Sequence, residues 1–129
     1  MLPVSAAGVS AVAGCAPEDE GFGNGAPVRA QDGSIPLEDL PENTGTLVNF
    51  GGDHPFVLLV RGSGDEVTGY SGYCTHNGCA LREKGEELDC PCHGSRFDPT
   101  TGEVLVGPAT IHLPEVPVVV EDGHVRRTA

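Results

Sequence analysis

Cysteine and histidine residues gather in two short segments of this chain. The first segment reads Cys74-Thr75-His76-Asn77-Gly78-Cys79, and the second reads Cys90-Pro91-Cys92-His93-Gly94-Ser95. Each segment supplies a cysteine and a histidine at close spacing and holds one further cysteine, so four of the five cysteines lie here. Thiolate sulfur and imidazole nitrogen are common ligands of zinc and iron. We therefore expect the two segments to converge on one metal site.

Three kinds of chemistry use cysteine and histidine at such spacing. Zinc fingers usually pair cysteine with cysteine and histidine with histidine along the sequence, whereas each segment here offers one of each. A cysteine nucleophile with a histidine base needs one residue of each type and leaves the rest of the pattern unexplained. A [2Fe–2S] cluster in which two histidines replace two cysteines on one iron uses all four ligands. The cluster fits the pattern best, and a zinc-stapled binding module is the alternative from a different class.

Both segments resemble the two cluster-binding boxes of the Rieske iron–sulfur proteins. They are most similar to the branch found in cytochrome bc complexes and arsenite-oxidising systems, and the similarity runs over about residues 44–129. The resemblance implies that two thiolates bind one iron and that two imidazoles bind the other through Nδ1, with their Nε2 edges near solvent. The four implied ligands are Cys74, Cys90, His76 and His93.

Further positions match this branch and imply supporting roles. Cys79 and Cys92 match its disulfide pair, which the Rieske ferredoxins of ring-hydroxylating oxygenases lack. Ser95 matches a serine that hydrogen-bonds a bridging sulfide, and Pro108 matches a proline loop that covers the cluster. Donors to sulfur raise the potential of such a centre. We also expect glycines to let N–H groups approach the sulfurs where a Cβ would crowd; these are Gly78 and Gly94.

Two positions depart from the pattern of the branch. Phe97 stands where the high-potential members carry a tyrosine that donates to a ligand sulfur. Without that hydroxyl we expect a lower midpoint potential than theirs, within a span of about −150 to +300 mV. Asn77 stands where quinol-oxidising members usually carry a leucine in the surface that docks at the quinone site. A polar residue there argues against direct oxidation of quinol.

The remainder of the sequence predicts short strands. Apolar and β-branched runs lie at residues 46–50, 56–60 and 66–70, and residues 116–126 read as a hairpin with an Asp-Gly turn. A weak helical pattern occurs only near residues 37–40, between two prolines. We therefore predict an all-β fold, an antiparallel β-sandwich or open barrel, with the two boxes as loops at one end.

The N-terminal residues resemble an export signal. Residues 1–14 are small and apolar, too few to span a bilayer as a helix, and similar to the apolar part of a signal peptide. The four residues that end at Cys15 resemble a bacterial lipobox, which implies an acylated Cys15. No lysine or arginine precedes Arg29, so an apolar tail with an idle thiol is the alternative. We predict a leader at 1–14, a flexible linker at 15–43 and a Rieske domain at 44–129.

Charge and resemblance together suggest a role. The formal charge of −12 argues against binding to nucleic acid. The resemblance implies one-electron transfer between redox partner proteins, on the outer face of a membrane to which a lipid anchor holds the chain. It implies no substrate chemistry of the chain's own. The alternative within this class is a subunit of a larger oxidoreductase, either quinol–cytochrome c reductase-like or arsenite-oxidase-like.

Overall fold

A computed structural model describes residues 27–128 of the chain. The fold is all-β, which confirms the predicted class, and its only helical element in this range is a 3-10 turn, η2 (Leu37–Asp39), at the weak helical pattern. No helix in the described range is both long and apolar enough to cross a membrane. The strands are β1 (Val28–Arg29), β2 (Ile35–Pro36), β3 (Thr44–Asn49), β4 (Phe56–Arg61), β5 (Val67–Ser71), β6 (Arg82–Lys84), β7 (Glu87–Asp89), β8 (Arg96–Phe97), β9 (Val104–Val106), β10 (Val118–Glu121) and β11 (His124–Arg127).

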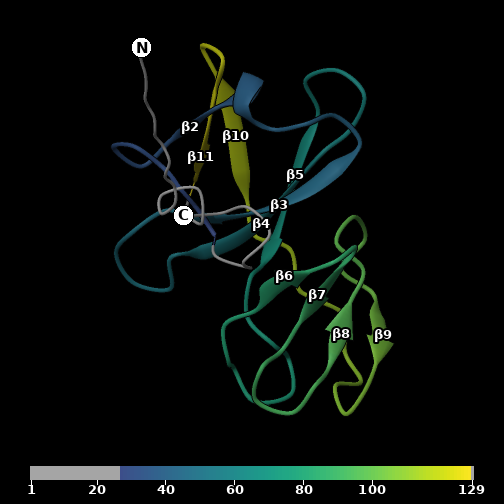
Figure 1. Ribbon diagram of the computed structural model, residues 1–129. Helices are drawn as coiled ribbons and strands as arrows, with labels where there is room; N and C mark the ends of the chain where they lie inside the picture. The colour runs from purple at the N-terminus through teal and green to yellow at the C-terminus, as the bar shows by residue number, and fades with distance from the viewer. Residues whose placement is uncertain (1–26, 129) are drawn as a thin grey trace, which may run out of the picture.

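These strands form three sheets, which Figure 1 shows one above another. The central sheet has the order β1-β3-β4-β5, and its three longer strands are antiparallel. A sheet of order β10-β11-β2 lies at one end, and a sheet of order β6-β7-β8-β9 lies at the other. The hairpin of β10 and β11 turns at Asp122-Gly123, as predicted, and both turn residues have positive φ.

The two faces of the central sheet pack into different hydrophobic cores because side chains alternate along a strand. Leu47 of β3 and Leu58 of β4 face the core shared with the β6–β9 sheet. Val48, Val57 and Leu59 face the core shared with β2 and β11. The central sheet therefore packs one face against the β6–β9 sheet and the other face against a second apolar layer.

Residues 28–43, predicted as part of a flexible linker, form elements of the fold in the structure. β1 pairs in parallel with β3, and β2 pairs with β11. Ile35, Leu37 and Leu40 are buried in the second core. The folded region therefore extends back to about Val28 rather than beginning at Thr44, because three apolar side chains here gain burial that a free linker would forgo. Residues 1–26, which include the predicted leader and Cys15, lie outside the described residues.

The β6–β9 sheet places both cysteine–histidine segments at its end. The segment 90–95 is the loop between β7 and β8, closed by the pair Asp89–Arg96. The segment 74–79 is closed in the same way by an antiparallel bridge between Tyr73 and Ala80. The acidic stretch from β6 to β7 is the hairpin that joins the two loops.

Candidate metal centre

The two cysteine–histidine loops have the same backbone hydrogen bonds. In the first, Cys74 N donates to Cys79 O at 2.8 Å and Gly78 N donates to Cys74 O at 2.8 Å. In the second, Cys90 N donates to Ser95 O at 2.8 Å and Gly94 N donates to Cys90 O at 2.9 Å. Each loop is therefore a tight six-residue hairpin loop that begins with the cysteine predicted to bind iron.

A glycine occupies the fifth position of each loop, where the backbone is left-handed. Gly78 has φ +81° and Gly94 has φ +84°, a left-handed conformation that side chains disfavour. A Cβ added at either position would meet no protein atom within 4 Å. The positive φ at both positions therefore already favours glycine, and the expected crowding of a Cβ against the cluster sulfurs stays a prediction.

A disulfide joins the two loops, which confirms the pairing of Cys79 with Cys92. It links residues 13 apart in the sequence, with their Cα atoms 6.4 Å apart. The sulfur of Cys90 lies within 4.8 Å of both disulfide sulfurs. The cross-link thus holds the second loop against the first directly beside one of the two free thiols.

The remaining cysteines of the loops, Cys74 and Cys90, are free and buried. Burial opposes ionisation of Cys74, but hydrogen bonds from the backbone of His76 and Asn77, and from the thiol of Cys90, still hold the pKa of Cys74 below its ordinary value. His76 N lies 3.3 Å from the Cys74 sulfur. Burial and the nearby Cys74 raise the pKa of Cys90, although the backbone of the second loop opposes this. The two thiols therefore share a dry site, in which N–H donors already point at sulfur.

The two histidines of the loops are exposed and lie edge to face. The ring centroids of His76 and His93 are 5.1 Å apart, and the two ring planes make an angle of 80°. Asn77 Nδ2 lies 2.9 Å from Nδ1 of His93. Nδ1 is the atom predicted to bind iron, and a nitrogen bound to iron has no lone pair left for this contact. Binding of the metal through Nδ1 therefore requires the Asn77 amide to give up this hydrogen bond.

The segment 107–113, which contains Pro108 of the predicted proline loop and is called the proline loop below, is tied to both cysteine–histidine loops. Ala109 N donates to Ser95 Oγ at 3.0 Å in a buried position, which leaves the Ser95 hydroxyl hydrogen free to donate elsewhere. Thr75 Oγ1 donates to Ile111 O at 2.5 Å. The second contact was missed from the sequence because nothing in the spacing links positions so far apart. Pro108 lies exposed between Gly107 and the buried Ala109.

The donor set fits a mixed iron–sulfur cluster. Two buried thiols lie together, two imidazoles lie together on the exposed side, and N–H groups of both loops face the sulfurs. Buried thiolates need such donors because an ionised group in an apolar site is otherwise costly. The structure brings together the four residues predicted as ligands, and their assignment stays a prediction; they are Cys74, Cys90, His76 and His93.

The histidines outside the two loops make contacts of their own. His54 packs against Tyr73, whose hydroxyl accepts a hydrogen bond from the backbone N–H of Phe56. His112 and His124 are exposed, and each contacts a nearby backbone carbonyl. These side chains therefore pack against neighbours or contact the backbone of nearby turns.

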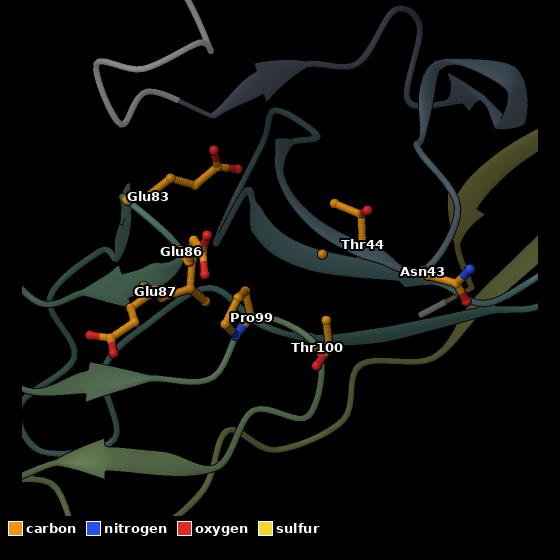
Figure 2. A pocket seen from close by; sticks show the side chains of 10 residues that line it. Asn43, Thr44, Glu83, Glu86, Glu87, Pro99 and Thr100 are labelled. Carbon is orange, nitrogen blue, oxygen red and sulfur yellow. The ribbon is translucent and has the colours of Figure 1, made fainter.

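A cavity of about 430 Å³ lies apart from the metal centre, between the central sheet and the β6–β7 hairpin. Figure 2 shows Glu83, Glu86 and Glu87 on one side of it and Asn43 and Thr44 on the other. None of the residues that line it belongs to the cysteine–histidine loops. This cavity is therefore separate from the residues predicted to hold the metal.

A model of the Rieske [2Fe-2S] domain family matches residues 34–117. The chain belongs to this family, whose domains bind a [2Fe–2S] cluster. It is 33% identical over 92 residues to the cytochrome b6-f complex iron-sulfur subunit of Chlorobaculum tepidum, covering 70% of this chain and 49% of that protein. It is also 33% identical over 91 residues to the cytochrome b6-f complex iron-sulfur subunit 1 of a Synechocystis species, covering 69% of this chain and 51% of that protein.

Solved structures agree with this family. The cyanobacterial plasma membrane Rieske protein PetC3 from Synechocystis PCC 6803 has a TM-score of 0.52 and 31% identity, over 67% of this chain and 87% of that one. A hyperthermophilic respiratory Complex III structure, with a TM-score of 0.54 and 22% identity over 74% of each chain, shows the same fold. The chain spans about half the length of the curated relatives it matches. The family membership favours the cluster over the zinc-stapled module, and the predicted cofactor is confirmed.

Proposed function

We propose that this protein carries one electron at a time through its cluster, at the outer face of a membrane. Its partners are a donor and an acceptor protein, and the chain transforms no substrate of its own. The observation that carries the proposal is the pair of equivalent loops, which gather two buried thiols and two exposed imidazoles and are locked by a disulfide. In this proposal the ligands are Cys74, Cys90, His76 and His93.

The residues around the centre have separate tasks in this proposal. When bound, the cluster supplies the one-electron couple. The buried thiols of Cys74 and Cys90 exclude water from the sulfur side. The loop N–H groups and the Ser95 hydroxyl stabilise negative charge on sulfur. The exposed rings of His76 and His93 form the side that a partner can approach.

Spectroscopy of the reduced protein tests the ligand set. We expect a rhombic electron paramagnetic resonance signal with a mean g value below that of a free electron, together with two irons per chain. His76→Gln and His93→Gln should each lose this signal. His112→Gln and His124→Gln, which alter exposed histidines outside the loops, serve as matched controls and should retain it. A reduced protein that gives no electron paramagnetic resonance signal and holds one zinc per chain would overturn the proposal.

A second candidate is a subunit of a larger oxidoreductase, either quinol–cytochrome c reductase-like or arsenite-oxidase-like. The similar curated proteins are named as subunits of cytochrome b6-f complexes, which supports this candidate. Asn77 in place of the usual leucine speaks against direct quinol oxidation. Purification of the tagged full chain from native membranes separates the two. A stoichiometric partner that survives detergent and salt supports the subunit, and a chain recovered alone supports the free carrier.

Attachment to the outer face is the further part of this proposal. The disulfide requires an oxidising compartment, which agrees with an exported domain. We propose that Cys15 carries the lipid anchor, as its lipobox-like context suggests. Mass spectrometry of the mature N-terminus should find an acylated Cys15, and Cys15→Ala should release the protein from the membrane. An unmodified Cys15 in membrane-bound protein would contradict this anchor.

A further inference from the structure

A second cavity, of about 270 Å³, opens where the ends of β4, β5 and β11 meet the turn between β3 and β4. Part of its lining is apolar and consists of Phe56, Val57 and Val116. The rest of its lining carries hydrogen-bonding groups and consists of His54, Ser71, Tyr73 and Arg127. Apolar walls with a few converging polar groups are the usual form of a site for a small molecule.

The charge of this cavity differs from that of the chain as a whole. The chain has 19 acidic residues and a formal charge of −12, yet no aspartate or glutamate lines this cavity. Three other cavities in the described range each have at least two carboxylates in their lining. A negatively charged ligand would therefore meet an arginine and no carboxylate among the residues that line this cavity.

Arg127 supplies the positive charge of the cavity. Its Nη1 donates to the carbonyl oxygen of His54 at 2.7 Å, and its Nη2 donates to that of Gly51 at 3.1 Å. These bonds use two of the five N–H donors of a guanidinium and hold the group in place. Arg127 forms no salt bridge with any described residue, whereas four other arginines do so: Arg61, Arg82, Arg96 and Arg126. Its charge is therefore positioned by carbonyls and left without an acidic partner in the part of the chain that the structure describes.

Two hydroxyl groups of the lining still have a hydrogen to donate. The Tyr73 hydroxyl accepts a hydrogen bond from Phe56 N at 3.3 Å, and Ser71 Oγ accepts one from Tyr73 N at 3.2 Å. Each hydroxyl has one O–H donor besides its lone pairs, and neither donates to another described residue. The cavity therefore offers donors from Ser71, Tyr73 and Arg127, and an oxygen anion can accept from all three.

The apolar part of the lining indicates what the anion should carry. The ring centroids of Phe56 and Tyr73 are 5.6 Å apart, and those of His54 and Tyr73 are also 5.6 Å apart. Aromatic side chains pack favourably against flat apolar groups. A bare inorganic anion would leave this wall in contact with water, whereas an anion with an aromatic or apolar body would cover it.

We propose that this cavity is a binding site for a small organic carboxylate with an aromatic or apolar body. Arg127 pairs with the carboxylate, and the hydroxyls of Ser71 and Tyr73 donate to it. The body lies against the apolar part of the lining. Tyr73 also forms the bridge with Ala80 that closes the first cysteine–histidine loop, so the bound carboxylate contacts the base of that loop. The site does not depend on the proposed electron transfer, and its test is independent of it.

Isothermal titration calorimetry of the full chain with its cluster tests the site, with phenylacetate as the probe. We expect saturable binding of phenylacetate, and much weaker binding of acetate, phosphate and phenethylammonium. Arg127→Gln should weaken the binding of phenylacetate roughly tenfold, because it removes the charge that pairs with the carboxylate. Arg126→Gln is the matched control, since the neighbouring arginine pairs with Glu121 and does not line the cavity. It should bind phenylacetate as the parent does.

A second variant keeps the test decisive if Arg127→Gln disturbs the turn that this arginine holds. Ser71→Ala/Tyr73→Phe retains the guanidinium and should also weaken the binding of phenylacetate roughly tenfold, because two donors to the carboxylate are lost. The proposal is overturned if phenylacetate does not bind saturably, or if the double variant binds it as the parent does. Equal binding of phenethylammonium would exclude an anion site. Equal binding of acetate or phosphate would show that the apolar wall takes no part, and would overturn the proposed class of ligand.

Discussion

The first and second loops of the metal centre share one backbone and differ in their side chains. Both begin with a free buried cysteine, have glycine at the fifth position and close with equivalent hydrogen bonds. At the third position the first loop carries His76 and the second carries Cys92, and at the fourth position they carry Asn77 and His93. The positions that the loops share thus set the loop conformation. The positions at which they differ give each loop different side-chain contacts.

This division explains how the loops can be joined. The disulfide runs from the sixth position of the first loop, Cys79, to the third position of the second, Cys92. The sixth position of the second loop is Ser95, which instead accepts a hydrogen bond from the proline loop. Two loops with identical side chains could not make these unlike contacts. The asymmetry in sequence therefore produces a centre with one cross-linked side and one side covered by a third segment.

The equivalence of the first positions predicts the largest effect. Cys74→Ser and Cys90→Ser should each abolish cluster binding, because each removes one of only two thiolates. Iron content and the visible absorption spectrum measure this. Retention of the cluster by one variant and not by the other would break the comparison between the loops.

Loss of the cross-link should have the next largest effect, now on stability. We expect the double variant Cys79→Ser/Cys92→Ser, which leaves no unpaired thiol behind, to lose about 3 kcal/mol of unfolding free energy. Urea denaturation of the oxidised protein measures the difference. Reduction of the disulfide in the parent protein should cause the same loss of unfolding free energy. If reduction left the unfolding free energy of the parent unchanged, the disulfide would not be what holds the loops together.

The contacts of the proline loop sharpen the comparison further. Ser95→Ala leaves the buried N–H of Ala109 without an acceptor and should cost about 1–3 kcal/mol of unfolding free energy. Thr75→Val removes the more exposed contact to Ile111 and should cost about 0.5 kcal/mol. Thermal unfolding of both variants shows which of them loses more stability. Equal losses would mean that the proline loop depends on both boxes alike.

A hydroxyl group added at Phe97, two residues after the second loop, should change the midpoint reduction potential of the cluster. Phe97 is fully buried in the core that also contains Cys74 and Cys90. Phe97→Tyr should raise the midpoint potential by about 50 mV, because a donor to sulfur favours the reduced state by about 1 kcal/mol. Protein-film voltammetry measures this, and an unchanged or lower midpoint would contradict the expected donor. Phe56→Tyr, in the central sheet, serves as the control.

A further effect, on how stability depends on pH, concerns the hairpin that joins the loops. Burial raises the pKa of the Glu83 carboxyl, against the hydrogen bond it accepts from Leu47 N. A raised pKa of an acid means that the folded state binds protons more readily, so stability falls as pH rises through the interval between the unfolded and folded values. Glu83→Gln should thus gain at most about 1 kcal/mol at neutral pH and nothing well below pH 4. Urea titrations at several pH values test the sign, and a loss at neutral pH would contradict it.

Much of the site was predictable because its geometry is local. Spacing within six residues places a cysteine, its partner glycine and a histidine in one loop, so Cys74 to Cys79 and Cys90 to Ser95 could be recognised directly. The resemblance supplied the disulfide, which the structure confirms. The left-handed backbone at Gly78 and Gly94 was not predicted, because a φ angle cannot be seen in a residue list.

The boundary of the fold was less predictable. Val28, Ile35 and Leu40 stand in a stretch rich in proline and turn residues, which reads as a linker by composition. They belong to the fold because β1 and β2 find partners far along the chain, in β3 and β11. Pairing between distant segments depends on packing that no local pattern encodes.

By itself, then, the sequence determined the chemistry of this protein: residue types at short spacing, and hence a Rieske domain with its cluster and its disulfide. Tertiary structure alone decided which surfaces surround that chemistry. It set the Ile111 carbonyl against Thr75, turned Leu105 outward at a bulge and set the Asn77 amide against His93. The physical reason is distance along the chain: ligands within a loop are set by a few backbone hydrogen bonds, whereas contacts between remote segments arise only when the whole core has packed.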